Sequence, residues 1–138
     1  MNAMTSTTLP LLRISTSDHL RLRMLVDIVI KSQPRLRATL EPLRAELERA
    51  DVLPPELLPH TVVVMGSKVE VQDLESGEVD TYTLVYPEHA DGAAGRLSIL
   101  APLGMGLIGF TEGDTFTWCT PGGPRQLLIR KVSPPAAA

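Results

Sequence analysis

Three prolines within the ten residues 51–60, DVLPPELLPH, divide the chain into two stretches with different periodicities. Proline lacks an amide hydrogen and interrupts helices and central strands, so this segment is expected to be a linker. Apolar residues recur at helical spacing before it and alternate after it. The sequence therefore predicts an α+β chain in which a helical hairpin over 15–50 precedes a small antiparallel β-sheet domain over 61–132 with one short helix. Residues 1–14 are expected to form a flexible N-terminus and 133–138 a frayed tail.

The first helix is predicted to begin after Ser15, because the run Ser15 to Asp18 offers several side chains that can cap a helix N-terminus. The residues Ser32-Gln33-Pro34 then interrupt the helical pattern. Five apolar residues follow the cap at helical spacing and indicate a helix: Leu20, Met24, Leu25, Ile28 and Val29.

A second helix is expected after Pro34, with apolar residues spaced four, three and four positions apart. This spacing is typical of the seam of an antiparallel coiled-coil hairpin. Pro42 lies within the run, so it is expected to kink the helix or to move the start of its regular part later. The seam residues are Leu36, Leu40, Leu43 and Leu47.

The second stretch of the chain predicts a series of short strands. A hairpin turn is expected at Ser76-Gly77, and a second one at the run PGGP that begins at Pro121. The expected strands are 61–65, 68–73, 78–86, 96–100, 115–120 and 126–132, with a short helix near 101–108.

Gly104, Gly106 and Gly109 form the pattern G-x-G-x-x-G, which occurs in dinucleotide-binding proteins. A dinucleotide site needs a full helix after the glycines and an acidic residue on a second parallel strand, and the sequence here continues instead into the turn FTEGD. The glycines are therefore interpreted as architectural. Pro102 is expected to begin a short helix that packs Leu103, Leu107 and Ile108 on the sheet, and Gly109 is expected to end that helix in a left-handed conformation.

Composition excludes several classes of function. The net charge of −3 supplies no overall basic field for nucleic acid, and aromatic residues, which stack on bases, make up only 4% of the chain.

Cys119 is the single cysteine and is expected in the core or half-buried. His89, beside Glu88 and Asp91, is interpreted as part of a solvated turn. We expect no cofactor, no metal and no catalytic residue. The absence of a signal sequence or a long apolar run favours a soluble cytoplasmic protein.

Several motifs in order resemble the C-terminal domain of the Gre transcript-cleavage factors. They are MGSKVEVQDLESGEVDTYTLVYPEHADGAAGRLS, then SILAPLGMGLIGFTEGD from Ser98 to Asp114, then CTPGGPRQLLIRKV. The resemblance covers roughly 62–132 and implies an FKBP-like domain. Within that superfamily, the single tryptophan, Trp118, and the segment LAPLG are most similar to the subfamily of regulators of nucleoside diphosphate kinase. The resemblance also implies binding to RNA polymerase.

The tip of the predicted hairpin differs from that of the Gre factors. Those factors carry acidic residues at the tip of a long coiled coil, which reaches through the polymerase secondary channel and helps to hold a catalytic Mg²⁺. Here the tip carries Lys31, Arg35 and Arg37, and the closest acids, Asp27 and Glu41, lie down the arms. Transcript cleavage is therefore not expected. A basic tip could contact nucleic acid or an acidic protein surface, or it could be a solvated turn without a partner.

The resemblance implies that the C-terminal domain docks on the rim of the polymerase channel through Ala101, Pro102, Leu103 and Leu107. The leading hypothesis is a non-catalytic transcription regulator that binds RNA polymerase near its secondary channel and competes with Gre-type elongation factors. The alternative is a regulator that binds nucleoside diphosphate kinase directly. A prolyl isomerase is disfavoured because its pocket is expected to need more aromatic residues than this chain has.

Overall fold

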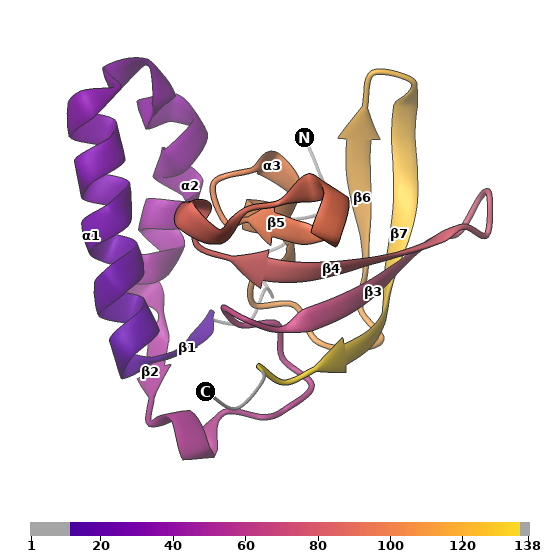
Figure 1. Cartoon of the computed structure of the whole chain (residues 1–138), viewed down its shortest axis with the longest axis horizontal. Coiled ribbons are helices and arrows are strands. Elements are labelled where there is room, and N and C mark those ends of the chain that lie inside the picture. The colour runs from indigo at the N-terminus through magenta and orange to yellow at the C-terminus, as the bar shows by residue number, and fades with distance from the viewer. Residues whose placement is uncertain (1–11, 136–138) are drawn as a thin grey trace. The chain divides into compact units, whose positions relative to one another are not determined.

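The computed structural model describes residues 12–135, and their contacts divide the chain into two compact units. Among these residues, 12–59 form a helical hairpin unit and 60–135 form a sheet unit. None of the helices within 12–135 is long and apolar enough to cross a membrane. Figure 1 shows both units.

The hairpin unit contains two helices, α1 (Thr16–Ser32) and α2 (Arg37–Arg49), joined by the 3₁₀ turn η2 (Pro34–Leu36). The predicted cap is confirmed, since the Ser15 hydroxyl accepts a hydrogen bond from the Asp18 amide at 3.2 Å. The α1 helix has 17 residues, so its length is about 25 Å. The α2 helix begins directly after η2 and continues through Pro42, whose ring lies on the exposed side, so the start of the helix is not delayed.

The two helices pack through a seam that the sequence predicted correctly for only one of them. On α2, Leu40, Leu43 and Leu47 are buried as predicted, and Leu36 is half-buried. On α1 the residues buried against the seam are Leu22, Val26 and Ile30, which the spacing of the sequence did not single out.

The α1 helix has apolar residues on two opposite sides, so periodicity alone could not identify the packed one. In the structure the packed side is the one that carries the buried residues Leu22, Val26 and Ile30. His19 lies on the same side as Leu22 and Val26, and its Nε2 donates a hydrogen bond to the Leu47 carbonyl oxygen at 2.7 Å. This bond joins that side of α1 to the last turn of α2.

A pair of short parallel strands closes the open end of the hairpin. The strand β1 (Arg13–Ser15) precedes α1, and β2 (Asp51–Leu53) follows α2, with Ile14 opposite Val52. Ile14 is fully buried. The periodicity of the sequence did not predict these strands, because three residues are too few to show alternation. The 3₁₀ turn η3 (Pro55–Leu57) follows.

The sheet unit contains five strands in the order β5-β4-β3-β7-β6. Their bounds are β3 (Lys68–Asp73), β4 (Val79–Val85), β5 (Arg96–Ser98), β6 (Thr115–Thr120) and β7 (Gly123–Ser133). The long β7 pairs with β6 and with β3, and its register with β3 shifts between Glu70 and Val71. Figure 1 shows β7 running along both neighbours in the curled sheet.

The sheet is mixed, which corrects the prediction of a wholly antiparallel one. The chain leaves β4 through two 3₁₀ turns, η4 (Pro87–His89) and η5 (Gly92–Ala94), and returns so that β5 runs parallel to β4. A connection of this length allows the chain to cross back before it pairs, whereas a tight hairpin would force antiparallel pairing.

The apolar run 62–65 is part of the core but is not the strand that its composition predicted. Residues Val62 to Met65 are all buried, yet the run makes only one isolated bridge, between Val62 and Thr111. The chain turns directly afterwards at Gly66, where φ is +87°, and the buried Ser67 hydroxyl accepts a hydrogen bond from the Val64 amide at 2.9 Å. Its β-branched composition therefore reflects burial rather than sheet pairing.

Candidate functional site

The short helix α3 (Pro102–Leu107) forms the centre of the predicted docking region, and it is positioned by the end of β5. The Ser98 hydroxyl accepts a hydrogen bond from the Leu100 amide at 3.0 Å, and the Ser98 carbonyl accepts one from the Ala101 amide at 3.0 Å. Pro102 then occupies the first turn of the helix, where its missing amide hydrogen costs nothing. The segment before α3 is therefore held by local hydrogen bonds.

Two of the three glycines of the G-x-G-x-x-G pattern are required by the local geometry of the backbone. A side chain at Gly104 would clash with the Ser98 carbonyl oxygen, so this glycine allows α3 to lie directly on the backbone of β5. Gly106 faces Trp118 at an ordinary distance. Gly109 has a φ of +89° and donates its amide hydrogen to the Val63 carbonyl at 2.9 Å, so it turns the chain after the helix as predicted.

The four residues predicted to dock on a partner differ in accessibility. Pro102 is exposed, and Ala101 and Leu103 are half-buried, so these three can offer apolar atoms to a second molecule. Leu107 is fully buried and anchors α3 to the core. A direct contact between Leu107 and a partner is therefore not compatible with its position. Ile108, which was expected on the sheet, is half-buried.

A groove of about 170 Å³ runs beside α3 within the sheet unit. Leu103 contributes to it from α3, Trp118 from β6 and Tyr82 from β4. Burial raises the pKa of the Tyr82 hydroxyl, and the negative charge of Asp80 adds to this effect. The groove thus combines an apolar and aromatic floor with charged groups, and its remaining lining residues are Val71, Asp73, Asp80, Thr120, Arg125 and Leu127.

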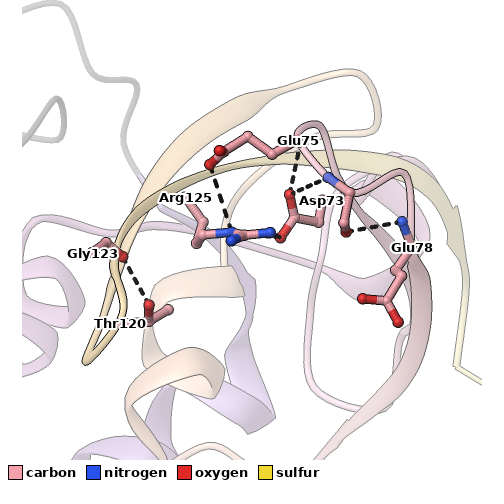
Figure 2. A network of polar contacts seen from close by, with 7 residues as sticks. Asp73, Glu75, Glu78, Thr120, Gly123 and Arg125 are labelled. Carbon is pink, nitrogen blue, oxygen red and sulfur yellow. Dashed lines mark hydrogen bonds and ion pairs between the residues drawn. The ribbon is translucent and has the colours of Figure 1, made fainter.

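Asp73 and Arg125 form the polar wall of the groove, and Figure 2 shows the network around them. The Arg125 guanidinium donates to Asp73 Oδ2 from Nη2 at 2.6 Å and from Nε at 2.8 Å. Asp73 Oδ1 accepts hydrogen bonds from the amides of Glu75 at 2.8 Å and Ser76 at 3.2 Å, which fixes the β3–β4 turn. Both carboxylate oxygens of Asp73 are therefore engaged.

The same contacts control the ionisation of the pair. Partial burial opposes the charge on Asp73, but the hydrogen bonds from Glu75, Arg125 and Ser76 outweigh it together, and the pKa of Asp73 is lowered from 3.8. The hydrogen bond to Asp73 in turn raises the pKa of the Arg125 guanidinium. Both groups are therefore charged at neutral pH.

The hairpin tip, defined here as residues 31–37, carries the three predicted cations on exposed positions. Lys31 is in the last turn of α1, and Arg35 is in η2, where its Nη2 donates to the Gln33 side-chain oxygen at 3.0 Å. Arg37 begins α2 and lies 3.9 Å from Glu41. The structure therefore gathers Lys31, Arg35 and Arg37 at one end of the hairpin.

The two carboxylates nearest to the tip are drawn toward an arginine of the arms. Arg44 lies 3.6 Å from Asp27 and 3.7 Å from Glu41, so it links the carboxylates of the two helices. The carboxylates belong to this exposed ion-pair cluster, one to two turns below the tip. Within the part of the chain that the structure describes, no group of three or more His, Cys, Asp or Glu side chains could hold a metal ion.

Two features of the site were not visible in the sequence. Tyr82, Trp118 and Arg125 come from three strands, and only the pairing of β3, β4, β6 and β7 brings them together around Leu103. Cys119 is exposed, which corrects the expectation of a core or half-buried residue. Successive side chains of a strand point to opposite faces of the sheet, and the neighbouring Trp118 in β6 is half-buried, so Cys119 points outward.

Comparison with known proteins agrees with the motifs found in the sequence. Residues 58–134 match the family described as transcription elongation factor, GreA/GreB, C-terminal. A regulator of nucleoside diphosphate kinase from Escherichia coli K12 is 45% identical over 98 residues, which cover 69% of this chain and 72% of that protein. A transcription elongation factor GreA from Methylococcus capsulatus is 36% identical over 103 residues, covering 74% of this chain and 65% of that protein.

A solved structure supports the same assignment along nearly the whole chain. The prokaryotic transcription elongation factor GreA/GreB from Nitrosomonas europaea is 40% identical and superposes with a TM-score of 0.76, covering 91% of this chain and 99% of that one. The family predicted from the motifs is thus confirmed. The chain belongs to the GreA/GreB family of transcription elongation factors and, within it, resembles the regulators of nucleoside diphosphate kinase.

Proposed function

We propose that this protein is a non-catalytic regulator that binds RNA polymerase near its secondary channel and competes there with Gre-type elongation factors. The observation that carries the proposal is the hairpin tip, which presents Lys31, Arg35 and Arg37 where the Gre factors carry acidic residues. Membership of the family supports polymerase as the partner.

The chemistry of the tip argues against metal-assisted transcript cleavage. Mg²⁺ is a hard cation that takes oxygen ligands, and it is held best by carboxylates that are free to coordinate. The closest carboxylates, Asp27 and Glu41, already lie within 3.6 and 3.7 Å of Arg44. Three cations around them would also repel a divalent cation. The tip is suited instead to contact with phosphates or with acidic protein side chains.

Docking is assigned to the exposed edge of α3 and the groove beside it. Ala101, Pro102 and Leu103 supply apolar atoms on a segment that local hydrogen bonds hold in place, so little conformational entropy is lost on binding. The aromatic floor of the groove can receive an apolar side chain of the partner. Leu107 supports this surface from below rather than contacting the partner.

The test is a competition experiment combined with a cleavage assay. The full chain is labelled at its N-terminus, because Cys119 is exposed and its neighbours Trp118 and Thr120 line the groove. We expect saturable binding to core RNA polymerase by fluorescence anisotropy, displacement by an unlabelled Gre factor, and no stimulation of cleavage in stalled elongation complexes. Binding without displacement by the Gre factor, or stimulated cleavage, would contradict the proposal.

A second candidate function rests on the name of one relative. The Escherichia coli protein that is 45% identical is called a regulator of nucleoside diphosphate kinase, so a direct complex with that kinase is the alternative. The same labelled protein distinguishes the two functions. Binding to purified kinase in the absence of polymerase, together with no binding to polymerase at micromolar concentrations, would favour the alternative.

A further inference from the structure

A second groove, of about 450 Å³, lies on the face of the sheet opposite to α3. Successive side chains of β3 point to opposite faces, so Glu70 lines this groove while Val71 lines the one beside α3. All of its lining residues belong to the sheet unit, so its walls do not depend on the hairpin unit. We call it the lysine groove and define it by its polar side chains, which are Lys68, Glu70, Thr81, Thr83, Lys131 and Ser133.

Strand pairing arranges these side chains in two rows across β4, β3 and β7. In the first row, Lys68 lies between Thr83 and Ser133. Directly opposite residues of paired strands have their Cβ atoms about 5 Å apart, so the Lys68 ammonium group has a hydroxyl group on each side. The first row therefore offers three hydrogen-bond donors to one ligand.

The second row is centred on Glu70, and a β-bulge places an arginine beside it. Glu70 is paired with Lys131 and Val71 with Ile129, so Arg130 is the extra residue of β7. Arg130 and Lys131 are consequently both exposed, and Arg130 Nε lies 3.9 Å from Glu70 Oε1. The negative charge of Glu70 is thus offset by Arg130.

The two lysines of the groove have no such partner. Within residues 12–135, neither Lys68 nor Lys131 forms an ion pair or a side-chain hydrogen bond. They lie on neighbouring strands, diagonally across the two rows, where two positive charges repel each other. An anion bound between them would replace this repulsion with two attractive contacts.

We propose that the lysine groove binds the phosphate group of a soluble small molecule. A phosphate group carries a charge of about −1.5 to −2 at neutral pH and has three strongly accepting oxygens, which suits two free ammonium groups and neighbouring hydroxyls. A carboxylate has one charge and two oxygens, so it would leave part of this set unused. The hydroxyl groups are those of Thr81, Thr83 and Ser133.

The size and lining of the groove indicate what carries the phosphate. Its volume falls within the range of about 300–1,000 Å³ that is usual for small-molecule sites, and it exceeds the volume of one phosphate group. None of the described residues that line it is aromatic, so a base could not stack there. Phosphates rather than a base therefore supply most of the affinity, and a polyphosphate is the best fit.

The lysine groove does not depend on the function proposed above. It shares no lining residue with the groove beside α3, and it contains no residue of the hairpin tip. Phosphate binding and polymerase binding can therefore succeed or fail separately.

The first test is isothermal titration calorimetry of the full chain with inorganic phosphate, tripolyphosphate and ATP, without magnesium. We expect saturable binding of one tripolyphosphate per chain, tighter than that of inorganic phosphate. Lys68→Gln and Lys131→Gln are each expected to weaken it about tenfold, because each removes a charge-assisted contact. The matched control is Lys31→Gln, which changes the net charge equally but lies at the hairpin tip, and it is expected to bind like the wild type.

The second test removes a hydroxyl group without changing any charge. Thr83→Val keeps the branched shape of the side chain, and it is expected to weaken tripolyphosphate binding several-fold. The control is Thr115→Val, at an exposed position of β6 outside the groove, and it is expected to have no effect. Circular dichroism melting curves show whether each variant is folded.

The two polyphosphates distinguish the possible sources of the phosphate. Equal affinity for tripolyphosphate and ATP would show that the phosphates alone are bound, and tighter binding of ATP would add a contact to the nucleoside.

Several results would overturn the proposal. One is the absence of saturable binding of all three compounds at millimolar concentration. Another is binding that Lys68→Gln and Lys131→Gln leave unchanged, or that Lys31→Gln weakens equally, because the anion would then bind elsewhere. A single-stranded RNA that binds more tightly than tripolyphosphate, and less tightly to Lys68→Gln, would exclude a small molecule as the preferred ligand.

Discussion

Gly104 shows how a single missing side chain can position a whole helix. The α3 helix lies so close to β5 that a methyl group at residue 104 would clash with the Ser98 carbonyl and approach the Ile99 Cα to 3.2 Å. Both of those atoms belong to the backbone and cannot move aside as a flexible side chain can. The position of Pro102 relative to the groove therefore depends on the absence of a side chain two residues later.

We expect Gly104→Ala to lower the free energy of unfolding by about 1–3 kcal/mol, which is the usual cost of overpacking a filled site. Urea denaturation followed by circular dichroism measures it. Gly106→Ala is the control, because its added methyl group would lie 3.6 Å from Trp118, an ordinary contact. This control is expected to be neutral or to stabilise the domain by up to about 1 kcal/mol, since alanine favours helix. Equal destabilisation by both substitutions would contradict the close-packing explanation.

Asp73 gives a prediction about pH. Its pKa is lowered in the folded state, so the charged form stabilises the fold at pH values above the unfolded pKa of about 3.9, and this contribution is lost as the pH falls through the lower folded pKa. We expect Asp73→Asn to be less stable than the wild type at pH 7 and the difference to shrink below about pH 4. Urea midpoints measured between pH 3 and pH 7 would show it.

The control for Asp73 lies in the same turn. Glu75 is 66% exposed and 3.7 Å from Arg125, so Glu75→Gln is expected to change stability little at any pH. A difference between Asp73→Asn and the wild type that stays constant down to pH 3 would show that the ion pair is not its source.

At the scale of secondary structure elements, α3 connects the fold to the proposed partner. Pro102→Glu places a charge on the exposed edge of this helix while keeping a residue that suits a first helical turn. We therefore expect polymerase binding to be lost and the thermal unfolding of the domain to be little changed. Anisotropy titrations with core polymerase and melting curves measure the two quantities.

Pro121 offers a matched control for this element. It is an exposed proline in the turn between β6 and β7, so Pro121→Glu makes the same chemical change outside α3. Binding is expected to be retained in this variant. Retained affinity in Pro102→Glu would remove α3 from the interface.

The hairpin tip gives a prediction about salt. If Arg35 and Arg37 contact an anionic surface, the affinity for polymerase falls as the salt concentration rises. The affinity of the double variant Arg35→Ala/Arg37→Ala then falls less steeply with salt. Titrations at several salt concentrations provide both slopes. The control is Arg49→Ala/Arg130→Ala, which removes two similarly exposed arginines outside the tip and is expected to keep the wild-type slope. Equal slopes for all three proteins would exclude the tip from the interface.

The sequence predicted the bounds of elements that begin or end near glycine and proline. It predicted less well which face of a helix packs and which side chains meet. Pro102 and Gly109 bracket α3, and β3 and β6 have the predicted bounds, because turn residues limit the conformations of the chain locally. The packed face of α1 was not predictable, since apolar residues lie on two opposite sides of this helix. The groove was also unpredictable, because Tyr82, Trp118 and Arg125 meet only through sheet pairing.

At the scale of the whole molecule, charge separates polymerase binding from general affinity for nucleic acid. The chain carries a net charge of −3, while its tip holds three cations within seven residues. The net negative charge of the chain repels free RNA or DNA, and the tip offers only a local concentration of cations. Polymerase is therefore expected to be bound in preference to free nucleic acid.

We expect the full chain to show no saturable binding to labelled duplex DNA or single-stranded RNA at physiological salt, although it binds polymerase under the same conditions. Anisotropy with the labelled nucleic acids measures this. A commercial basic protein of similar mass serves as the positive control for the assay. Tight, salt-sensitive binding of the free nucleic acids would contradict the expectation and would identify the tip as an autonomous nucleic-acid site.

The parallel strands β1 and β2 have a consequence for how the hairpin can change over evolution. They tie the first residue of α1 to the last residue of α2, so the base of the hairpin is fixed whatever the length of the arms. Insertion of one heptad in each arm keeps the apolar seam in phase and moves the tip outward by about 10 Å. Paired insertions or deletions can therefore lengthen or shorten the hairpin in discrete steps without any change in the sequence of the sheet unit.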